Sequence, residues 1–154
     1  LSRTMTKYKG TKKEELALET FVKFMRSANT VSAEVQSHLT KQKLTMSQFG
    51  VLEALYHLGP MYQRDLAEKI LKTTGNITTV IDNLEKRGLV ERQREMKDRR
   101  YFKVVLTSSG RRLTKKIFPD HATQITKCMS RLTMPEQREL GKLCKKIGVV
   151  EKKS

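Results

Sequence analysis

The sequence predicts a mainly α (α+β) fold: a winged helix-turn-helix unit with a two-stranded β-hairpin wing, flanked by N- and C-terminal helices. Apolar residues recur at helical spacing in six successive segments. Two short alternating runs, 89–94 and 101–106, indicate antiparallel strands joined by the charged turn 96–100. Two helices, a strand, a turn and a second strand follow one another between residues 66 and 107, which is the order of a winged helix-turn-helix.

The first predicted helix precedes the winged-helix unit, and the second begins it. Apolar positions with helical spacing, uninterrupted by Gly or Pro, predict an amphipathic helix over residues 14–39. Thr45 and Gln48 form a capping-box pattern that starts a second helix, and Gly59-Pro60 ends it. The second helix should bury Phe49, Leu52 and Leu55.

The next elements form the predicted two-helix core and the wing. A short helix is expected over residues 63–71, followed by a helix whose core face carries Ile77, Val80, Ile81 and Leu84. Gly88 can adopt a left-handed conformation and end that helix, so the first strand begins directly after it. In the second strand, Phe102, Val104 and Leu106 alternate with Tyr101, Lys103 and Val105. One face of the strand, that of Phe102, should therefore pack inward, and the other can face solvent or DNA.

Two further helices complete the chain. Residues 107–110 open the fifth helix, and a capping-box pattern at Thr133 and Glu136 opens the sixth. The first, fifth and sixth helices carry apolar stripes outside the small core, and leaving such stripes in water costs about 25 cal/mol per Å². We therefore expect residues 14–40 and 108–148 to form a dimerisation region around residues 45–107; the alternative is a helical bundle within one chain.

The charge balance points to a polyanionic partner. The 154 residues include 32 Lys and Arg but only 16 Asp and Glu, which gives a net charge of +16 and a pI near 10.1. Double-stranded DNA is the leading candidate and an anionic membrane surface is second, because the positive charge is spread along the whole length. No apolar run suggests a transmembrane span or a signal peptide, so a cytoplasmic location is expected.

The sequence contains no recognisable motif for metal binding or catalysis. The three histidines, His38, His57 and His121, lie on different predicted helices, and Cys128 and Cys144 fit neither a disulfide framework nor a zinc site. There is no Gly-rich phosphate loop, nucleophile elbow or pair of carboxylates in an apolar setting. We therefore expect no metal, no cofactor and no enzymatic activity.

Several short motifs, in their order and spacing, resemble the multiple antibiotic resistance regulator (MarR) family of winged-helix transcription factors. They are Leu66-Ala67-Glu68-Lys69, Gly75-Asn76-Ile77-Thr78, Leu84-Glu85-Lys86-Arg87-Gly88-Leu89-Val90, Asp98-Arg99-Arg100 and Val105-Leu106-Thr107-Ser108-Ser109-Gly110. Residues 44–58 and 118–121 also fit the family layout. The resemblance implies a homodimer in which the fourth helix enters the major groove of DNA and the wing tip enters the adjacent minor groove.

The fourth helix offers the side chains that could read DNA. Its face opposite the core, with the two residues before it, carries short hydroxyl and amide groups that can approach base edges or phosphates: Thr73, Thr74, Asn76, Thr78, Thr79 and Asn83. Asn76 and Thr79 are the preferred base readers. The alternative is that one threonine caps the helix and the remaining polar residues form a solvated face.

The wing supplies the second group of candidates. The resemblance places Arg100 in the minor groove and implies that Asp98 braces the turn by pairing with an arginine. Arg94, Lys97 and Arg99 are expected to contact phosphates, which adds affinity and salt dependence but little sequence preference.

The resemblance also implies a small aromatic or phenolic effector bound between the dimer helices and the DNA-binding domain. Residues that could line such a site are Phe21, Met25, Phe49, Leu52, Tyr56 and His57, although they could equally be ordinary core residues. The sequence as a whole predicts a sequence-specific transcriptional regulator, a repressor that binds a pseudo-palindromic operator as a homodimer. The alternative left open is a basic architectural protein that coats DNA regardless of sequence.

Overall fold

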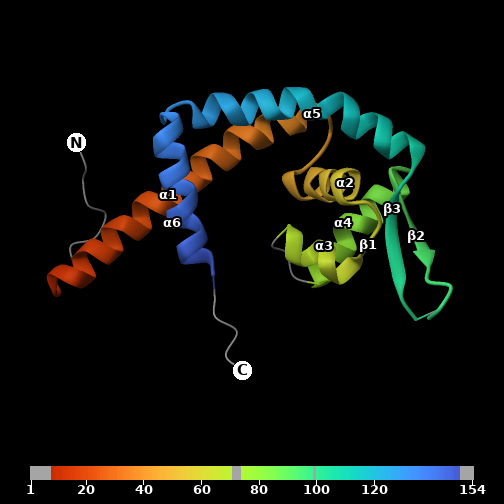
Figure 1. Ribbon diagram of the computed structural model, residues 1–154, viewed down its shortest axis with the longest axis horizontal. Coiled ribbons are helices and arrows are strands. Elements are labelled where there is room, and N and C mark those ends of the chain that lie inside the picture. Colours follow the sequence, from red (N-terminus) through yellow and green to blue (C-terminus); the bar gives the residue numbers. More distant parts are fainter. Residues whose placement is uncertain (1–7, 71–73, 99, 150–154) are drawn as a thin grey trace.

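The computed structural model describes residues 8–70, 74–98 and 100–149, and it confirms the predicted fold class. The elements in chain order are α1 (Lys12–Thr40), α2 (Met46–Leu58), β1 (Met61–Tyr62), α3 (Gln63–Lys69), α4 (Thr74–Lys86), β2 (Val90–Arg94), β3 (Phe102–Leu106), α5 (Ser108–Met129) and α6 (Met134–Gly148). Figure 1 shows α5 along the top of the molecule with α1 beside it, and α2, α3, α4 and the strands below its first half.

Three helices begin at capping boxes. The predicted boxes at Thr45 and Thr133 are present, each with the threonine hydroxyl and the side chain three residues later satisfying backbone N–H groups. A third box that was not predicted, formed by Thr11 and Glu14, starts α1 at Lys12, two residues before the predicted start. Polar side chains at the helix ends therefore set these boundaries by local hydrogen bonding.

The sheet has one strand more than the predicted hairpin. Its order is β1-β3-β2, and both pairings are antiparallel, with Met61 opposite Val104 and Val90 opposite Leu106. Strand β1 was missed because its two residues are too short to show an alternating pattern. We define the wing as residues 90–106. Strand β1 attaches the start of α3 to the base of this wing.

The expected inward face of β3 is only partly buried. Val104 is fully buried, whereas Phe102 is 39% exposed. Phe102 pairs with Arg94 at the far end of the hairpin, and the Arg94 guanidinium lies 5.3 Å from the centre of its ring. The alternation is present, but the wing extends past the helices that could cover Phe102.

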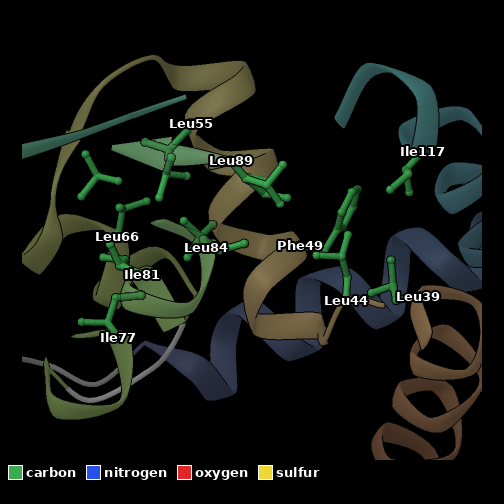
Figure 2. Packing of buried hydrophobic residues seen from close by; sticks show 14 of the residues in the cluster. Leu39, Leu44, Phe49, Leu55, Leu66, Ile77, Ile81, Leu84, Leu89 and Ile117 are labelled. Carbon is green, nitrogen blue, oxygen red and sulfur yellow. The ribbon is translucent and has the colours of Figure 1, made fainter. Parts of the chain in front are cut away.

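A single apolar core joins the winged-helix elements to the long helices. The α4 residues Ile77, Ile81 and Leu84 are completely buried. Figure 2 shows them grouped with Leu55 and Leu66, while Phe49 lies toward Leu39, Leu44 and Ile117. The core thus fixes one face of α4 inward and leaves its opposite face outward.

Side-chain hydrogen bonds tie the turn between α1 and α2 to the end of α4. The Gln36 amide donates to the Leu44 carbonyl and accepts from the Met46 N–H. The Arg87 guanidinium donates to the carbonyl of Lys43 at 2.7 Å, and Lys43 itself has a positive φ of 56°. These bonds therefore connect the α1–α2 turn to Arg87, the residue directly after α4.

The terminal helices leave much apolar surface uncovered. No residue of α6, which lies wholly within the described part of the chain, is buried. Its large apolar side chains are exposed together with those of the N-terminal half of α1: Leu16, Phe21, Phe24, Met25, Leu140, Leu143 and Ile147. Among the described residues, no helix has the length and apolar character needed to cross a membrane.

Candidate nucleic-acid interface

Helix α4 presents a polar outer face opposite its buried one. Asn76, Thr79 and Asn83 are exposed, as the helical spacing from the buried core residues requires. Thr78 is half-buried and accepts a hydrogen bond of 2.6 Å from the Gln63 amide at the start of α3. Thr78 therefore links the two helices of the motif as well as lying beside the outer face.

Three predicted DNA contacts cannot be placed at side-chain level. Thr73 and Arg99 lie outside the described residues. Thr74 is the first residue of α4, and the structure describes its backbone but not the surroundings of its side chain. The expectations for these three residues remain predictions from the sequence.

Asp98 and Arg100 form a closed ion pair in the turn of the wing. The Arg100 Nε and Nη2 atoms donate to the two carboxylate oxygens of Asp98 at 3.0 and 2.8 Å, and the Arg100 backbone N–H donates to Oδ1 at 3.1 Å. The side-chain hydrogen bond, with the backbone one second, holds the pKa of Asp98 below its usual value. The arginine that braces Asp98 is thus the same residue expected to enter the minor groove, and its side chain is still 83% exposed.

The remaining cationic candidates lie along the same hairpin. Arg94 is exposed and lies over the ring of Phe102, and Lys97 is exposed in the turn. Figure 1 shows the wing, α3 and α4 on the same side of α5. Helix α4 and the hairpin that carries these cations therefore lie on the same side of α5.

Arg92 connects the wing to α4 and was not singled out in the sequence. Its guanidinium bonds Asp82 at 2.7 Å and Glu85 at 3.0 Å, and the Arg92 backbone N–H donates to the second oxygen of Glu85. Only 20% of the Arg92 side chain is exposed. Because both carboxylates are on α4, this pair of ion bridges joins that helix to strand β2.

A second cluster holds the wing to β1. The Tyr62 hydroxyl donates to Glu95 at 2.8 Å, and Lys103 bonds the same carboxylate oxygen at 3.3 Å. The hydrogen bond from Tyr62 is the main reason that the pKa of Glu95 is lowered, and it raises the pKa of Tyr62. Arg92 and Tyr62 together attach both strands of the hairpin to the helical unit.

The predicted ligand-lining residues do not gather in one place. A cavity of about 700 Å³ lies where α1, α2, α3 and α5 meet, and Phe49 and His57 line it. Leu52 is fully buried in the core, and Tyr56 packs beneath the Arg111 guanidinium at 5.5 Å. Phe21 and Met25 belong to the exposed surface of α1.

The cavity also contains groups that the sequence interpretation did not assign to it. Glu53, Lys69 and His121 line it, from α2, α3 and α5. Helical spacing could place Glu53 and His57 on one face of α2, but nothing in the sequence indicates that His121, over sixty residues later, joins them. Among the described residues, no group of three or more His, Cys, Asp or Glu side chains could hold a metal ion.

Comparison with known proteins identifies the family. The MarR family model matches residues 44–102. The HTH-type transcriptional regulator MhqR of Bacillus subtilis (strain 168) is 33% identical over 135 residues, which cover 88% of this chain and 93% of the relative. The chain belongs to the MarR family.

Solved MarR-like structures agree with this fold. Bordetella bronchiseptica BpsR, whose structure concerns regulation of its DNA binding by 6-hydroxynicotinic acid, is 28% identical, with a TM-score of 0.77 over 85% of this chain and 99% of its own. The MarR family regulator Sco3205 of Streptomyces coelicolor, solved with DNA, has a TM-score of 0.81 over 92% of this chain and 89% of its own, and its 20% identity supports the fold alone.

Proposed function

We propose that the protein is a sequence-specific DNA-binding transcriptional regulator that binds a pseudo-palindromic operator as a homodimer, represses nearby genes and has no catalytic role. The observation that carries the proposal is the exposed polar face of α4, a helix that lies on the same side of α5 as the cationic wing. Because the proposed operator is chromosomal, the protein would bind it in the cytoplasm. Membership of a family of transcriptional regulators supports the proposal of a sequence-specific regulator and favours it over a sequence-independent DNA coat.

In this proposal, α4 lies in the major groove and reads base edges. Asn76, Thr79 and Asn83 carry short amide or hydroxyl groups that can hydrogen-bond to bases without keeping the helix away from the groove. Thr73, Thr74 and Thr78 would contact the DNA backbone near the start of the helix. The bond from Gln63 to Thr78 would hold α3 behind α4.

The wing would enter the adjacent minor groove with Arg100 at its tip. Its long, planar and always charged side chain suits the negative potential of a narrow minor groove. Asp98 would hold the guanidinium in place and offset part of its charge. Arg94, Lys97 and Arg99 would then contact phosphates on either side.

Dimerisation would cover the terminal helices. The exposed apolar side chains of α1 and α6 form the surface that a second copy could bury, with residues 14–40 and 108–148 as the dimerisation region around the DNA-binding domain, 45–107. A two-fold dimer would place its two α4 helices in successive major grooves, about 34–36 Å apart.

A small aromatic or phenolic effector would bind in the cavity between α1, α2 and α5. A bound molecule there could change the spacing of the two α4 helices, since α1 and α2 connect to the end of α4 through Lys43 and Arg87. The regulation of BpsR by 6-hydroxynicotinic acid supports an aromatic effector. Of the six residues first expected to line the site, Phe49 and His57 stay in this proposal.

Fluorescence anisotropy tests the proposal against a sequence-independent DNA coat. The protein is titrated onto duplex DNA from upstream of its own gene and onto a scrambled duplex of equal length, near physiological salt. We expect a preference of about 10³-fold for the native site, with two protomers bound, because regulators discriminate by at least this much. If the native and scrambled duplexes bind equally, genomic fragments are selected for binding to the protein. Affinity for every selected fragment equal to that for the scrambled duplex would favour the DNA coat.

Replacing Arg100 by Ala should weaken specific binding by about 1–3 kcal/mol through loss of the minor-groove contact. The dimer should stay folded, because the lost side chain is 83% exposed and its partner, Asp98, lies in the same turn. The measurement is the ratio of operator to scrambled-duplex affinity. Lys97→Ala is the matched control: as a phosphate contact, it should weaken binding to both duplexes alike. Unchanged operator binding by folded Arg100→Ala protein would remove Arg100 from the interface.

A further inference from the structure

Two consecutive residues, Tyr62 and Gln63, connect the wing to α4 by side-chain hydrogen bonds. Tyr62 is the last residue of β1, and Gln63 is the first residue of α3. The Tyr62 hydroxyl donates to the Glu95 carboxylate of the wing at 2.8 Å. The Gln63 amide donates to the Thr78 hydroxyl of α4 at 2.6 Å. A single peptide bond therefore separates an attachment to the wing from an attachment to α4.

Glu95 directly follows β2 and begins the turn of the wing. Its backbone N–H donates to the Tyr101 carbonyl at 3.0 Å, and the Tyr101 N–H donates to the Asp98 carbonyl at 3.1 Å. The Asp98 carboxylate in turn accepts two hydrogen bonds from the Arg100 guanidinium. The residue anchored by Tyr62 is thus part of the same hydrogen-bonded turn as Arg100.

The bond between Tyr62 and Glu95 is partly buried and involves a charged acceptor. Only 24% of the Glu95 side chain is exposed, and the Lys103 ammonium bonds the same carboxylate oxygen at 3.3 Å. Lys103 also lies 5.2 Å from the centre of the Tyr62 ring. The Tyr62 hydroxyl is the first cause of the lowered pKa of Glu95, and Lys103 is the second. Hydrogen bonds to a charged group are stronger than neutral ones, so this contact is suited to holding the turn in place.

We propose that Tyr62 is a specificity-determining positioning residue, which holds the wing relative to α4 so that Arg100 and the outer face of α4 enter their two grooves together. The inference rests on the proposed function, in which both elements contact one operator. A wing held in place before binding loses less freedom on binding, which favours a site that fits both elements. A scrambled duplex, bound through its phosphates, would gain little from that placement.

Tyr62→Phe tests this role, because it removes the hydroxyl and keeps the ring. We expect the ratio of operator to scrambled-duplex affinity, measured by anisotropy, to fall about tenfold, the effect of one well-made hydrogen bond. Glu95→Gln keeps an oxygen that can accept from Tyr62 and should retain most of the ratio, whereas Glu95→Ala should lose it. A folded Tyr62→Phe protein with the wild-type ratio overturns the proposal.

A double substitution separates positioning of the wing from general damage to the protein. If Tyr62 acts by placing Arg100, Tyr62→Phe should lower the ratio little further once Arg100→Ala has removed the minor-groove contact. Circular dichroism checks that each variant is folded. Two losses that multiply in full would show that Tyr62 acts independently of Arg100, and they would overturn the proposal.

Amide hydrogen exchange, followed by NMR without DNA, gives a readout of the wing alone. Tyr62→Phe should speed the exchange of the Glu95 N–H by about fivefold or more, because the turn opens more often. The Arg92 N–H, bonded to Glu85 at the other attachment of the wing, should keep its rate. Tyr101→Phe, which removes the hydroxyl of the neighbouring exposed ring, should change neither rate. Unchanged exchange at Glu95 in the Tyr62→Phe protein rejects the positioning role.

These measurements distinguish failure of this inference from failure of the proposed function. An operator preference that survives Tyr62→Phe rejects the inference and leaves the regulator proposal standing. A wild-type protein without operator preference rejects the regulator proposal and, with it, the specificity role of Tyr62. In that case the exchange rate at Glu95 still decides whether Tyr62 positions the wing.

Discussion

Replacing Leu143 by Glu is expected to make the protein monomeric and to lower operator affinity by about 100-fold or more, because half-site binding loses the second set of contacts. Leu143 is 52% exposed on α6, on the same apolar stripe as Leu140 and Ile147. Placing a carboxylate in an apolar dimer interface would bury a charge without a partner. Light scattering after gel filtration gives the mass, and anisotropy gives the affinity.

The control for this prediction changes the net charge equally on another part of α6. Lys145→Gln lowers the net charge by one, as Leu143→Glu does, but at an exposed position away from the apolar stripe. It should leave both the mass and the affinity close to those of the wild type. A Leu143→Glu protein that remains dimeric and binds the operator normally would show that α6 lies outside the dimer interface.

Replacing Gly110 by Ala is expected to lower the free energy of unfolding by about 3 kcal/mol, the upper end of the usual cost of overpacking. A Cβ atom at Gly110 would overlap the backbone carbonyl of Leu89, which cannot rotate away. The junction is already tight, because Thr107 donates from its N–H to Leu89 and from its hydroxyl to Gly88. Urea denaturation followed by circular dichroism measures the loss.

Gly141→Ala provides the comparison, since among the described residues no atom outside the neighbouring backbone of α6 lies within 4 Å of the Cβ position there. It should stabilise α6 by up to about 1 kcal/mol through helix propensity alone. If Gly110→Ala unfolds at the same urea concentration as the wild type, the packing of α5 against the end of α4 is looser than the structure indicates.

Local chemistry in the sequence determined most of the secondary structure. The capping boxes at Thr45 and Thr133, the cap at Gly88 and the apolar spacing of α4 each act over a few residues, so they can be recognised without the fold. The exposed positions of Asn76, Thr79 and Asn83 follow from that same spacing, because the inward face of α4 fixes the outward one.

Contacts between distant segments could be decided only by the tertiary structure. Strand β1 exists because Met61 pairs with Val104, and the wing is joined to α4 because Arg92 reaches Asp82 and Glu85. Phe102 is exposed because the hairpin extends past the helices that could cover it. His121 lies against Phe49 because α5 packs on α2. Periodicity tells which face of an element is buried, but it carries no information on which distant residue will lie against that face.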